Sequence, residues 1–239
     1  MISFYFAKPS LFSRPVWITL LEKQLDFQPI YVEMGNQEQF SPEFRALNPF
    51  SRIPVLVDDG FRVMESQAIL DYLETKYPAP KLLPSGAEAL ATVRMVQMVS
   101  INELVPAIGE LLMQPEEKRT YAQNRANTAL DLFETLLGNA PYFGGDQLSL
   151  GDIMAGSLVP VAGDLGISLE NHPHLQTWIK TLMSRPAWQH TQLSDAEKAR
   201  FLRSIRAMSK IWQRRRRQRA EILLEPNKTA PSSSSPGSS

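Results

Sequence analysis

Two pairs of residues in the first third of the sequence have the types and spacing of a binding site for a peptide-like acid. Glu65-Ser66 stands directly before a stretch with helical spacing, so Ser66 falls at a helix N-terminus, where free N–H groups attract a carboxylate. Ile53-Pro54 precedes an apolar run. If this bond is cis, the N–H and C=O of Ile53 turn outward toward an extended ligand. The alternative is that Ser66 only caps its helix and Glu65 is a solvated charge.

The elements that position these residues are a turn, a strand, a hairpin, a second strand and a helix. Asn48-Pro49 predicts the turn, because the residue before a proline avoids the helical region. Pro54 suits the first position of a strand, since proline cannot donate to a sheet ladder. Asp59-Gly60 is a hairpin signal. The helix after Ser66 is indicated by apolar residues at helical spacing: Ile69, Leu70, Leu73 and Tyr77.

The order of these signals resembles that of a known family. N-P-x-x-x-I-P-V-L, then D-G, then E-S before a helix, all within residues 48–66, is similar to the glutathione-binding half of the cytosolic glutathione transferases. The resemblance extends over roughly residues 1–190. It implies an α/β plus all-α protein, with an N-terminal thioredoxin-like domain (βαβ-α-ββα) and a C-terminal all-helical bundle.

The residues before the turn agree with that order of elements. Residues 2–6 and 28–33 predict two strands, and the apolar residues between them have helical spacing. Pro15 stands in the first turn after Ser13, so Ser13 is expected to cap this helix. Ser41-Pro42 opens a short helix in the same way.

Proline and glycine divide the chain into its expected domains. Residues 79–87 are predicted to be a linker between a glutathione-binding domain over residues 1–78 and a helical domain over residues 88–192. Residues 88–113 and 115–137 are predicted to form two long helices of the second domain.

Ser149 and Asp152 predict a capping box at the start of a further, buried helix. Leu148 and Ile153 stand where they can form a hydrophobic staple across the same helix start. This motif is interpreted as structural and is assigned no catalytic role.

The C-terminal part has a different charge from the body. Residues 194–239 hold eleven Lys and Arg against four Asp and Glu, although the whole chain has a net charge of zero. A basic helical extension is predicted over residues 193–225 and a disordered tail over 226–239, which is rich in Ser and Pro. The arginine-rich region Arg214 to Arg219 is interpreted as a solvated face, with nucleic acid or an anionic membrane as the minor alternative.

Composition excludes several classes of protein. The chain has no cysteine, which rules out disulfides, cysteine-ligated zinc and a protein thiol nucleophile. Its three histidines, His172, His174 and His190, are too badly spaced to predict a metal site, and no bound cofactor is expected. No apolar run has the length of a membrane span, and the N-terminus lacks the pattern of a secretory signal. The expectation is a cytoplasmic protein.

The resemblance implies that the reactive group is the thiol of glutathione, which the protein must hold as the nucleophilic thiolate. S-x-x-x-R-x-V, at Ser10, Arg14 and Val16, resembles the serine-type (theta-like) members, in which the serine donates a hydrogen bond to the sulfur. Ser10 is therefore the candidate catalytic residue. Ser13, whose place suits helix capping, and Tyr5, near the end of the first strand, are the alternatives.

The same resemblance assigns the remaining site residues. The cysteinyl backbone of glutathione is assigned to Ile53 and Pro54. Its γ-glutamyl end is assigned to Glu65 and Ser66, and its glycyl carboxylate to Arg52 and Gln39. The electrophile site is expected to be apolar and lined by residues that could equally be plain helix core: Leu11, Phe12, Val105, Ile108 and Met113.

The expected function is that of a glutathione transferase, with glutathione as co-substrate and a small hydrophobic electrophile or a peroxide as the second substrate. The resemblance also implies a homodimer. The lack of cysteine disfavours thiol transferases and dehydroascorbate reductases, and the missing S-S-C motif disfavours zeta-like isomerases. The alternative is a non-catalytic module of the same fold that acts in interaction or regulation through its basic tail. Ser10, Glu65 and Ser66 together favour the enzyme.

Overall fold

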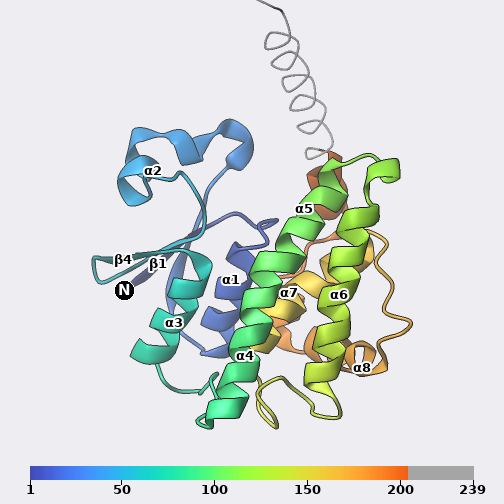
Figure 1. The fold of residues 1–239 in the computed structure, drawn as a ribbon. Helices are drawn as coiled ribbons and strands as arrows, with labels where there is room; N and C mark the ends of the chain where they lie inside the picture. Colours follow the sequence, from blue (N-terminus) through green and yellow to red (C-terminus); the bar gives the residue numbers. More distant parts are fainter. Residues whose placement is uncertain (204–239) are drawn as a thin grey trace, which may run out of the picture.

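The computed structural model of the chain describes residues 1–203, and Figure 1 shows how their elements are arranged. The predictions of a disordered tail and of a solvated Arg214 to Arg219 region lie outside the described residues. So does the part of the helical extension beyond residue 203.

A four-stranded mixed sheet forms the centre of the N-terminal domain. Its order is β2-β1-β3-β4: β1 (Ile2–Phe6) pairs in parallel with β2 (Phe27–Tyr31) and antiparallel with β3 (Val55–Asp58), which pairs antiparallel with β4 (Phe61–Met64). The predicted Asp59-Gly60 hairpin is confirmed, with both residues at the positive φ that such a turn requires.

Helices cover the two faces of this sheet unequally. Because side chains alternate along a strand, Phe4 and Phe6 of β1 enter the main core, which also includes residues of α1 (Ser13–Glu22) and α3 (Ser66–Lys76). Tyr5, between them, packs in a small separate cluster with Phe44 of α2 (Pro42–Leu47). Figure 1 shows α2 apart from α1 and α3. Two short 3-10 turns, Met34–Asn36 and Glu38–Phe40, lead into α2.

The C-terminal domain is a helical bundle, as expected. Its helices in the described residues are α4 (Ala87–Val99), α5 (Val105–Met113), α6 (Thr120–Leu137), α7 (Leu150–Asp164), α8 (Pro173–Met183) and α9 (Pro186–His190). A 3-10 turn, Glu116–Lys118, precedes α6, so the second long helix begins later than residue 115. Residues 195–203 are helical as well and form the start of the predicted extension.

The first long predicted helix is interrupted by a π turn, Ser100–Leu104, between α4 and α5. Pro106 has no N–H, so the carbonyl of Asn102, four residues earlier, loses its helical donor. Arg125 of α6 supplies a replacement, because its Nη2 donates to that carbonyl at 2.5 Å. The helix is therefore continuous in path but not in hydrogen-bond pattern.

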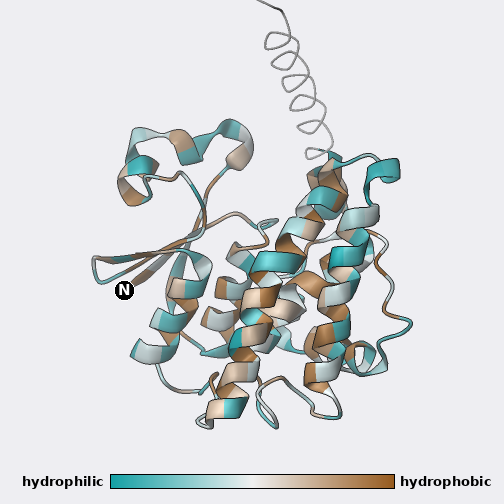
Figure 2. Cartoon of the chain, viewed as in Figure 1, coloured by the Kyte–Doolittle hydropathy of each residue, from teal (hydrophilic) through white to brown (hydrophobic). Residues whose placement is uncertain are grey.

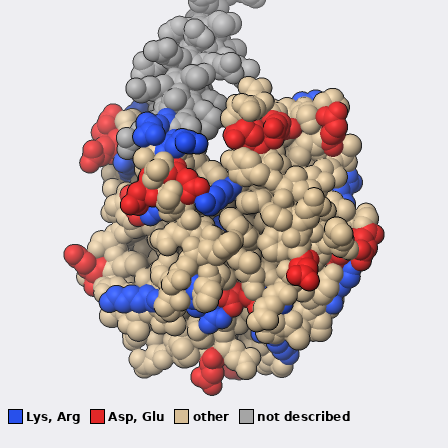
Figure 3. Space-filling view, turned by 180° about the vertical axis from the view of Figure 1, so that it is seen from behind, with Lys and Arg blue, Asp and Glu red and all other residues tan. Residues whose placement is uncertain are grey.

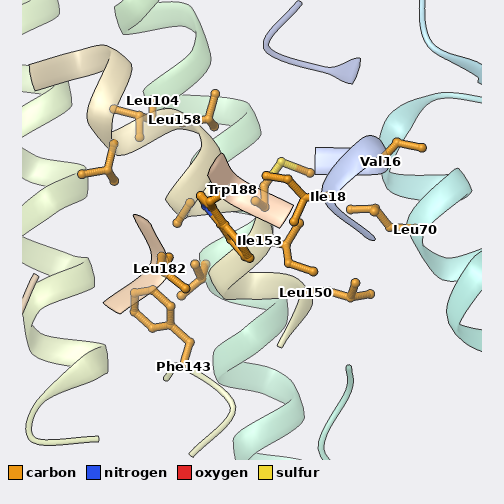
Figure 4. Packing of buried hydrophobic residues seen from close by; sticks show 14 of the residues in the cluster. Val16, Ile18, Leu70, Leu104, Phe143, Leu150, Ile153, Leu158, Leu182 and Trp188 are labelled. Carbon is orange, nitrogen blue, oxygen red and sulfur yellow. The ribbon is translucent and has the colours of Figure 1, made fainter. Parts of the chain in front are cut away.

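Helix α7 lies at the centre of the molecule and starts as predicted. The Asp152 N–H donates to Ser149 Oγ, and the Ser149 N–H donates to the Asp152 carboxylate. One core cluster runs from Val16 and Ile18 of α1 to Ile153 of α7 and Trp188 of α9, as Figure 4 shows. The two domains therefore share one core.

Among the described residues, Ala87–Met113 is the one stretch with the length and mean hydropathy, 1.2, of a membrane span. In the fold it is a bundle helix, with α4 packed against α7 and α5 against α6. Figure 2 shows hydrophilic and hydrophobic segments interleaved along it. This is the pattern of an amphipathic helix that packs one face in a bundle.

Candidate functional site

The sheet register brings the predicted site residues to one end of the sheet. Tyr5 of β1 lies opposite Val55 of β3, and Val55 lies opposite Met64 of β4. Because β3 is antiparallel to both neighbours, the end of β1, the start of β3 and the end of β4 lie together. The turn that contains Ser10, the Ile53-Pro54 bond and the Glu65-Ser66 pair all project from this end.

Ser10 lies in the turn between β1 and α1. Its N–H donates to the carbonyl of Ala7 at 3.0 Å, and its side-chain oxygen accepts the N–H of Ser13 at 3.2 Å. A hydroxyl that accepts in this way still has its own proton to donate. The Ser10 hydroxyl therefore stands at the positive end of α1 with a donor available.

The prediction that Ser13 caps α1 is wrong. Ser13 is the first residue of the helix, and the side-chain oxygen that accepts from the helix start is that of Ser10. Ser13 is 1% exposed, and its hydroxyl has no hydrogen-bond partner among the described residues.

Tyr5 points away from the start of α1. Its ring packs edge-on against Phe44 of α2, with the centroids 6.3 Å apart, on the face of the sheet opposite to the main core. Of the three hydroxyls considered, Ser10 is the one whose oxygen accepts a hydrogen bond from the start of α1.

The turn before β3 has the geometry on which the peptide-binding hypothesis depends, since the Ile53-Pro54 bond is cis. Asn48, which is 1% exposed, holds this turn from inside. Its amide nitrogen donates to the Arg52 carbonyl at 2.7 Å, and its amide oxygen accepts the Phe50 N–H at 3.0 Å. The N-P signal therefore identified the residue that shapes the loop.

Glu65 and Ser66 lie at the start of α3 with unusual backbone geometry. Glu65 has φ 66° and ψ 121°, a conformation that non-glycine residues rarely adopt. It occupies the N-cap position, while Ser66 is the first helical residue and no side chain of the described residues caps the helix. The alternative in which Ser66 is only a cap is therefore wrong, and within residues 1–203 the first N–H groups of α3 have no side-chain acceptor.

The structure adds Gln67, which the sequence analysis did not select. It is the second residue of α3, and its side-chain oxygen is buried without a partner among the described residues. A free acceptor beside free N–H groups suits a ligand that carries both an ammonium and a carboxylate. The available sequence signal was a polar side chain directly after Glu65-Ser66.

The two residues assigned to the glycyl carboxylate have different environments. Arg52 is exposed, and its side chain makes no hydrogen bond or ion pair with the described residues, so its five donors are open to an anion. Gln39 lies in the Glu38–Phe40 turn, is 7% exposed and has an unpartnered side-chain oxygen.

The apolar residues assigned to the electrophile site divide into two groups. Phe12 and Met113 are 40% and 37% exposed, and Leu11 and Val105 are half-buried at the edge of the core. Ile108 is fully buried within the core cluster. Ile108 therefore has the packing role that was its alternative, and the other four residues remain candidates.

The fold and the site together define a class of protein, and comparison with known sequences gives the same class. Residues 9–76 match the family model of the glutathione S-transferase N-terminal domain, and residues 87–186 match that of the C-terminal domain. The chain belongs to the glutathione S-transferase family.

Individual relatives have moderate sequence identity to this chain. Glutathione S-transferase hmp2 of Hypomyces subiculosus is 33% identical over 72% of this chain and 90% of its own length. Rat maleylacetoacetate isomerase is 30% identical over 73% and 84%. The solved structure of a glutathione S-transferase-I bound with lactoylglutathione aligns with a TM-score of 0.71 and 26% identity, covering 80% of this chain and 97% of that one.

Proposed function

We propose that the chain is a serine-type glutathione transferase in which the Ser10 hydroxyl donates a hydrogen bond to the glutathione sulfur. The observation that carries this proposal is the Ser13 N–H bond to Ser10 Oγ at 3.2 Å. This bond orients the hydroxyl at the N-terminus of α1 and leaves its proton free. A donor and a helix N-terminus both favour a thiolate over a thiol, and the thiolate is the attacking form.

Glutathione lies in this proposal across the end of the sheet, as a short extended peptide. Its cysteinyl part pairs with the backbone around Ile53 and Pro54, and its γ-glutamyl carboxylate meets the uncapped N-terminus of α3 at Ser66. Gln67 and Glu65 supply acceptors for the γ-glutamyl ammonium. A similar protein, glutathione S-transferase-I, has a solved structure with lactoylglutathione bound, which supports a glutathione compound as the ligand.

In the same orientation, the glycyl carboxylate is bound by Arg52 and Gln39. Arg52 is exposed and unpaired among the described residues, and its guanidinium can bind a carboxylate through two hydrogen bonds. The second substrate, a small hydrophobic electrophile or a peroxide, enters between Leu11 and Phe12 on one side and Val105 and Met113 on the other.

The test is glutathione binding by calorimetry, together with a pH titration of thiolate absorbance in the complex, for wild type and Ser10→Ala. We expect both proteins to bind glutathione, with the thiol pKa lowered only in the wild type, and kcat to fall by roughly 10²-fold or more in the variant.

Ser13→Ala is the matched control, because it removes a hydroxyl three residues away that is buried and has no partner among the described residues. It should keep the lowered thiol pKa. An equally low thiol pKa in wild type and Ser10→Ala would refute the role of Ser10, and an absence of glutathione binding by the wild type would refute the transferase.

We expect the enzyme to be located in the cytoplasm and to form a homodimer. Exposed apolar side chains on the loop before β3 and on α4, namely Phe50, Met95 and Met98, supply surface that a second subunit would cover. Light scattering of the purified protein tests the dimer. The comparisons give no support to the alternative of a non-catalytic module.

A further inference from the structure

The helix at residues 195–203 follows the part of the chain that matches the family models, which ends at residue 186. In Figure 1 it lies beside the upper end of α5. Glu197 in its first turn accepts a hydrogen bond from Lys8 Nζ at 2.7 Å, across 189 residues of sequence. Lys8 belongs to the turn that presents Ser10, so this helix reaches the candidate catalytic turn directly.

Glu197 is held firmly within its own helix. Its Oε2 accepts the Ser194 N–H at 2.8 Å and the Ser194 hydroxyl at 2.7 Å, while the Glu197 N–H donates to Ser194 Oγ at 3.3 Å. This is a capping box, and it leaves Oε1 for Lys8. The hydrogen bond from Lys8 and those from Ser194 lower the pKa of Glu197 to about 2, so the carboxylate is charged at any pH at which the enzyme would work.

Lys8 is well placed to transmit this contact to Ser10. It stands between Ala7, whose carbonyl accepts the Ser10 N–H at 3.0 Å, and Pro9, which directly precedes Ser10. Its side chain is 33% exposed. Fixing the Lys8 side chain therefore restrains the same short turn that sets the direction of the Ser10 hydroxyl.

A second ion pair fastens the same helix to the other domain. Lys198 Nζ lies 3.0 Å from Asp164 Oδ2 at the end of α7. The first turn of the helix thus bridges the Ser10 turn and the bundle through two separate pairs. Figure 3 shows basic and acidic side chains next to one another at the end of the molecule where the described chain finishes.

We propose that Glu197 is a positioning residue for Ser10: through Lys8 it holds the turn so that the hydroxyl faces the glutathione sulfur. This inference rests on the proposed glutathione transferase function. It assigns a part in the reaction to a segment that lies beyond the matched domains.

The deciding experiment compares Lys8→Met with Lys198→Met in the full chain. Each substitution removes one ion pair of the same helix, but only the first pair touches the Ser10 turn. Lys198 is substituted rather than Asp164, because Asp164 also interacts with Arg14 of α1. The readouts are the thiol pKa of bound glutathione, kcat, and KM for glutathione.

In Lys8→Met we expect a raised thiol pKa and a kcat lower by about tenfold, since small misplacements of a catalytic group are costly. KM for glutathione should stay within about twofold, because the turn and not the peptide-binding edge has moved. Lys198→Met should keep the thiol pKa of the wild type. Lys8→Arg preserves the ion pair, so its kcat and its thiol pKa should be close to those of the wild type.

Two further measurements do not depend on how well the Lys8 variant folds. Glu197→Gln keeps a side chain that can complete the capping box but removes the charge, and it should reproduce the Lys8→Met thiol pKa. Added salt should raise the thiol pKa of the wild type toward that of Lys8→Met, because a partly exposed pair is screened.

The outcomes separate the two proposals. A wild type that binds no glutathione, or binds it with an ordinary thiol pKa, overturns the proposed function itself. A lowered thiol pKa in the wild type that persists in Lys8→Met and Glu197→Gln overturns only the positioning role. Equal decreases in kcat and equal increases in the thiol pKa in Lys8→Met and Lys198→Met also overturn the positioning role, because docking of the helix alone would then account for the effect.

Discussion

Asp152 lies in a fully buried site where hydrogen-bond donors converge on both of its oxygens. One oxygen accepts the Phe143 N–H at 2.9 Å and the Trp178 Nε1–H at 2.8 Å. The other accepts from the backbone and the hydroxyl of Ser149. Burial nevertheless dominates and raises the pKa of Asp152 to about 6. The residue that starts α7 is therefore also a titrating group in the core.

This pKa predicts how stability changes with pH. Since the folded-state pKa of Asp152 exceeds its ordinary value of 3.8, the folded protein binds the extra proton between about pH 4 and 6. The contribution of Asp152 is then most favourable below pH 4 and falls by up to about 3 kcal/mol as the pH rises through 6.

Denaturant unfolding at several pH values, for wild type and Asp152→Asn, measures this change. The variant should be less stable throughout, because its amide cannot accept all the donors, and it should lack the decline between pH 4 and 6. If the free energy of unfolding changes with pH in the same way in both proteins, the raised pKa cannot belong to Asp152.

Contacts between α1, α3 and the following linker depend on one buried ion pair. Lys23 at the end of α1 has a fully buried ammonium, which lies 2.6 Å from Glu74 and donates to the carbonyls of Tyr77 and Pro80 at 2.8 Å. Glu74 in turn accepts the N–H groups of two linker residues, Leu82 and Leu83. One lysine thus joins two helices to the linker.

Lys23→Met should lower the free energy of unfolding by about 3–5 kcal/mol, since it leaves a buried carboxylate unpaired. Lys23→Met combined with Glu74→Leu should recover part of that loss, because no buried charge then remains. Lys81→Met is the control, because it removes an exposed lysine whose one side-chain bond in the described part of the chain is to Ser85, and it should change stability by less than about 0.5 kcal/mol. A loss in Lys23→Met no larger than in this control would contradict the prediction.

Local signals predicted the elements well where a few neighbouring residues decide the backbone. Asp59-Gly60 and the Ser149 capping box are of this kind, and both are confirmed. The cap of α1 was not predictable in this way. Ser10 and Ser13 both precede Pro15, and the backbone of the turn, held by the Ala7 carbonyl, decides which hydroxyl meets the helix.

Two other features lay beyond sequence reasoning for physical reasons. Val105 and Ile108 are three residues apart in α5 and so share one helix face, which is why simple helical spacing could not separate Ile108 in the core from Val105 at its edge. The Lys8–Glu197 pair joins residues 189 apart. Such a contact follows from the packing of the whole chain, not from any local pattern.

At the scale of the whole molecule, the two domains share one apolar core. Val16 of α1 and Leu70 of α3 belong to the same cluster as Leu158 of α7 and Trp188 of α9, and Figure 4 shows these side chains together. A bidentate ion pair between Arg185 and Glu22, at 3.0 and 2.6 Å, adds a polar link across the same boundary. Neither domain can unfold without exposing the buried surface of the other.

The domains should therefore unfold in one cooperative transition, and a change deep in one should weaken both. Gly156 of α7 tests this, because a Cβ there would lie 2.3 Å from the Leu182 side chain and 3.4 Å from the Trp188 ring nitrogen. Gly156→Ala should cost about 1–3 kcal/mol through overpacking.

Native-state hydrogen exchange shows which amides lose protection in Gly156→Ala. If the shared core couples the domains, the slowest amides of β1 lose as much protection in Gly156→Ala as those of α6, although β1 lies in the other domain. Gly163→Ala, at a position of the same helix with open space around it, should leave both unchanged. Loss of protection confined to the bundle would show that the sheet domain is stable without its partner. The shared core would then be a docking surface between two independent units.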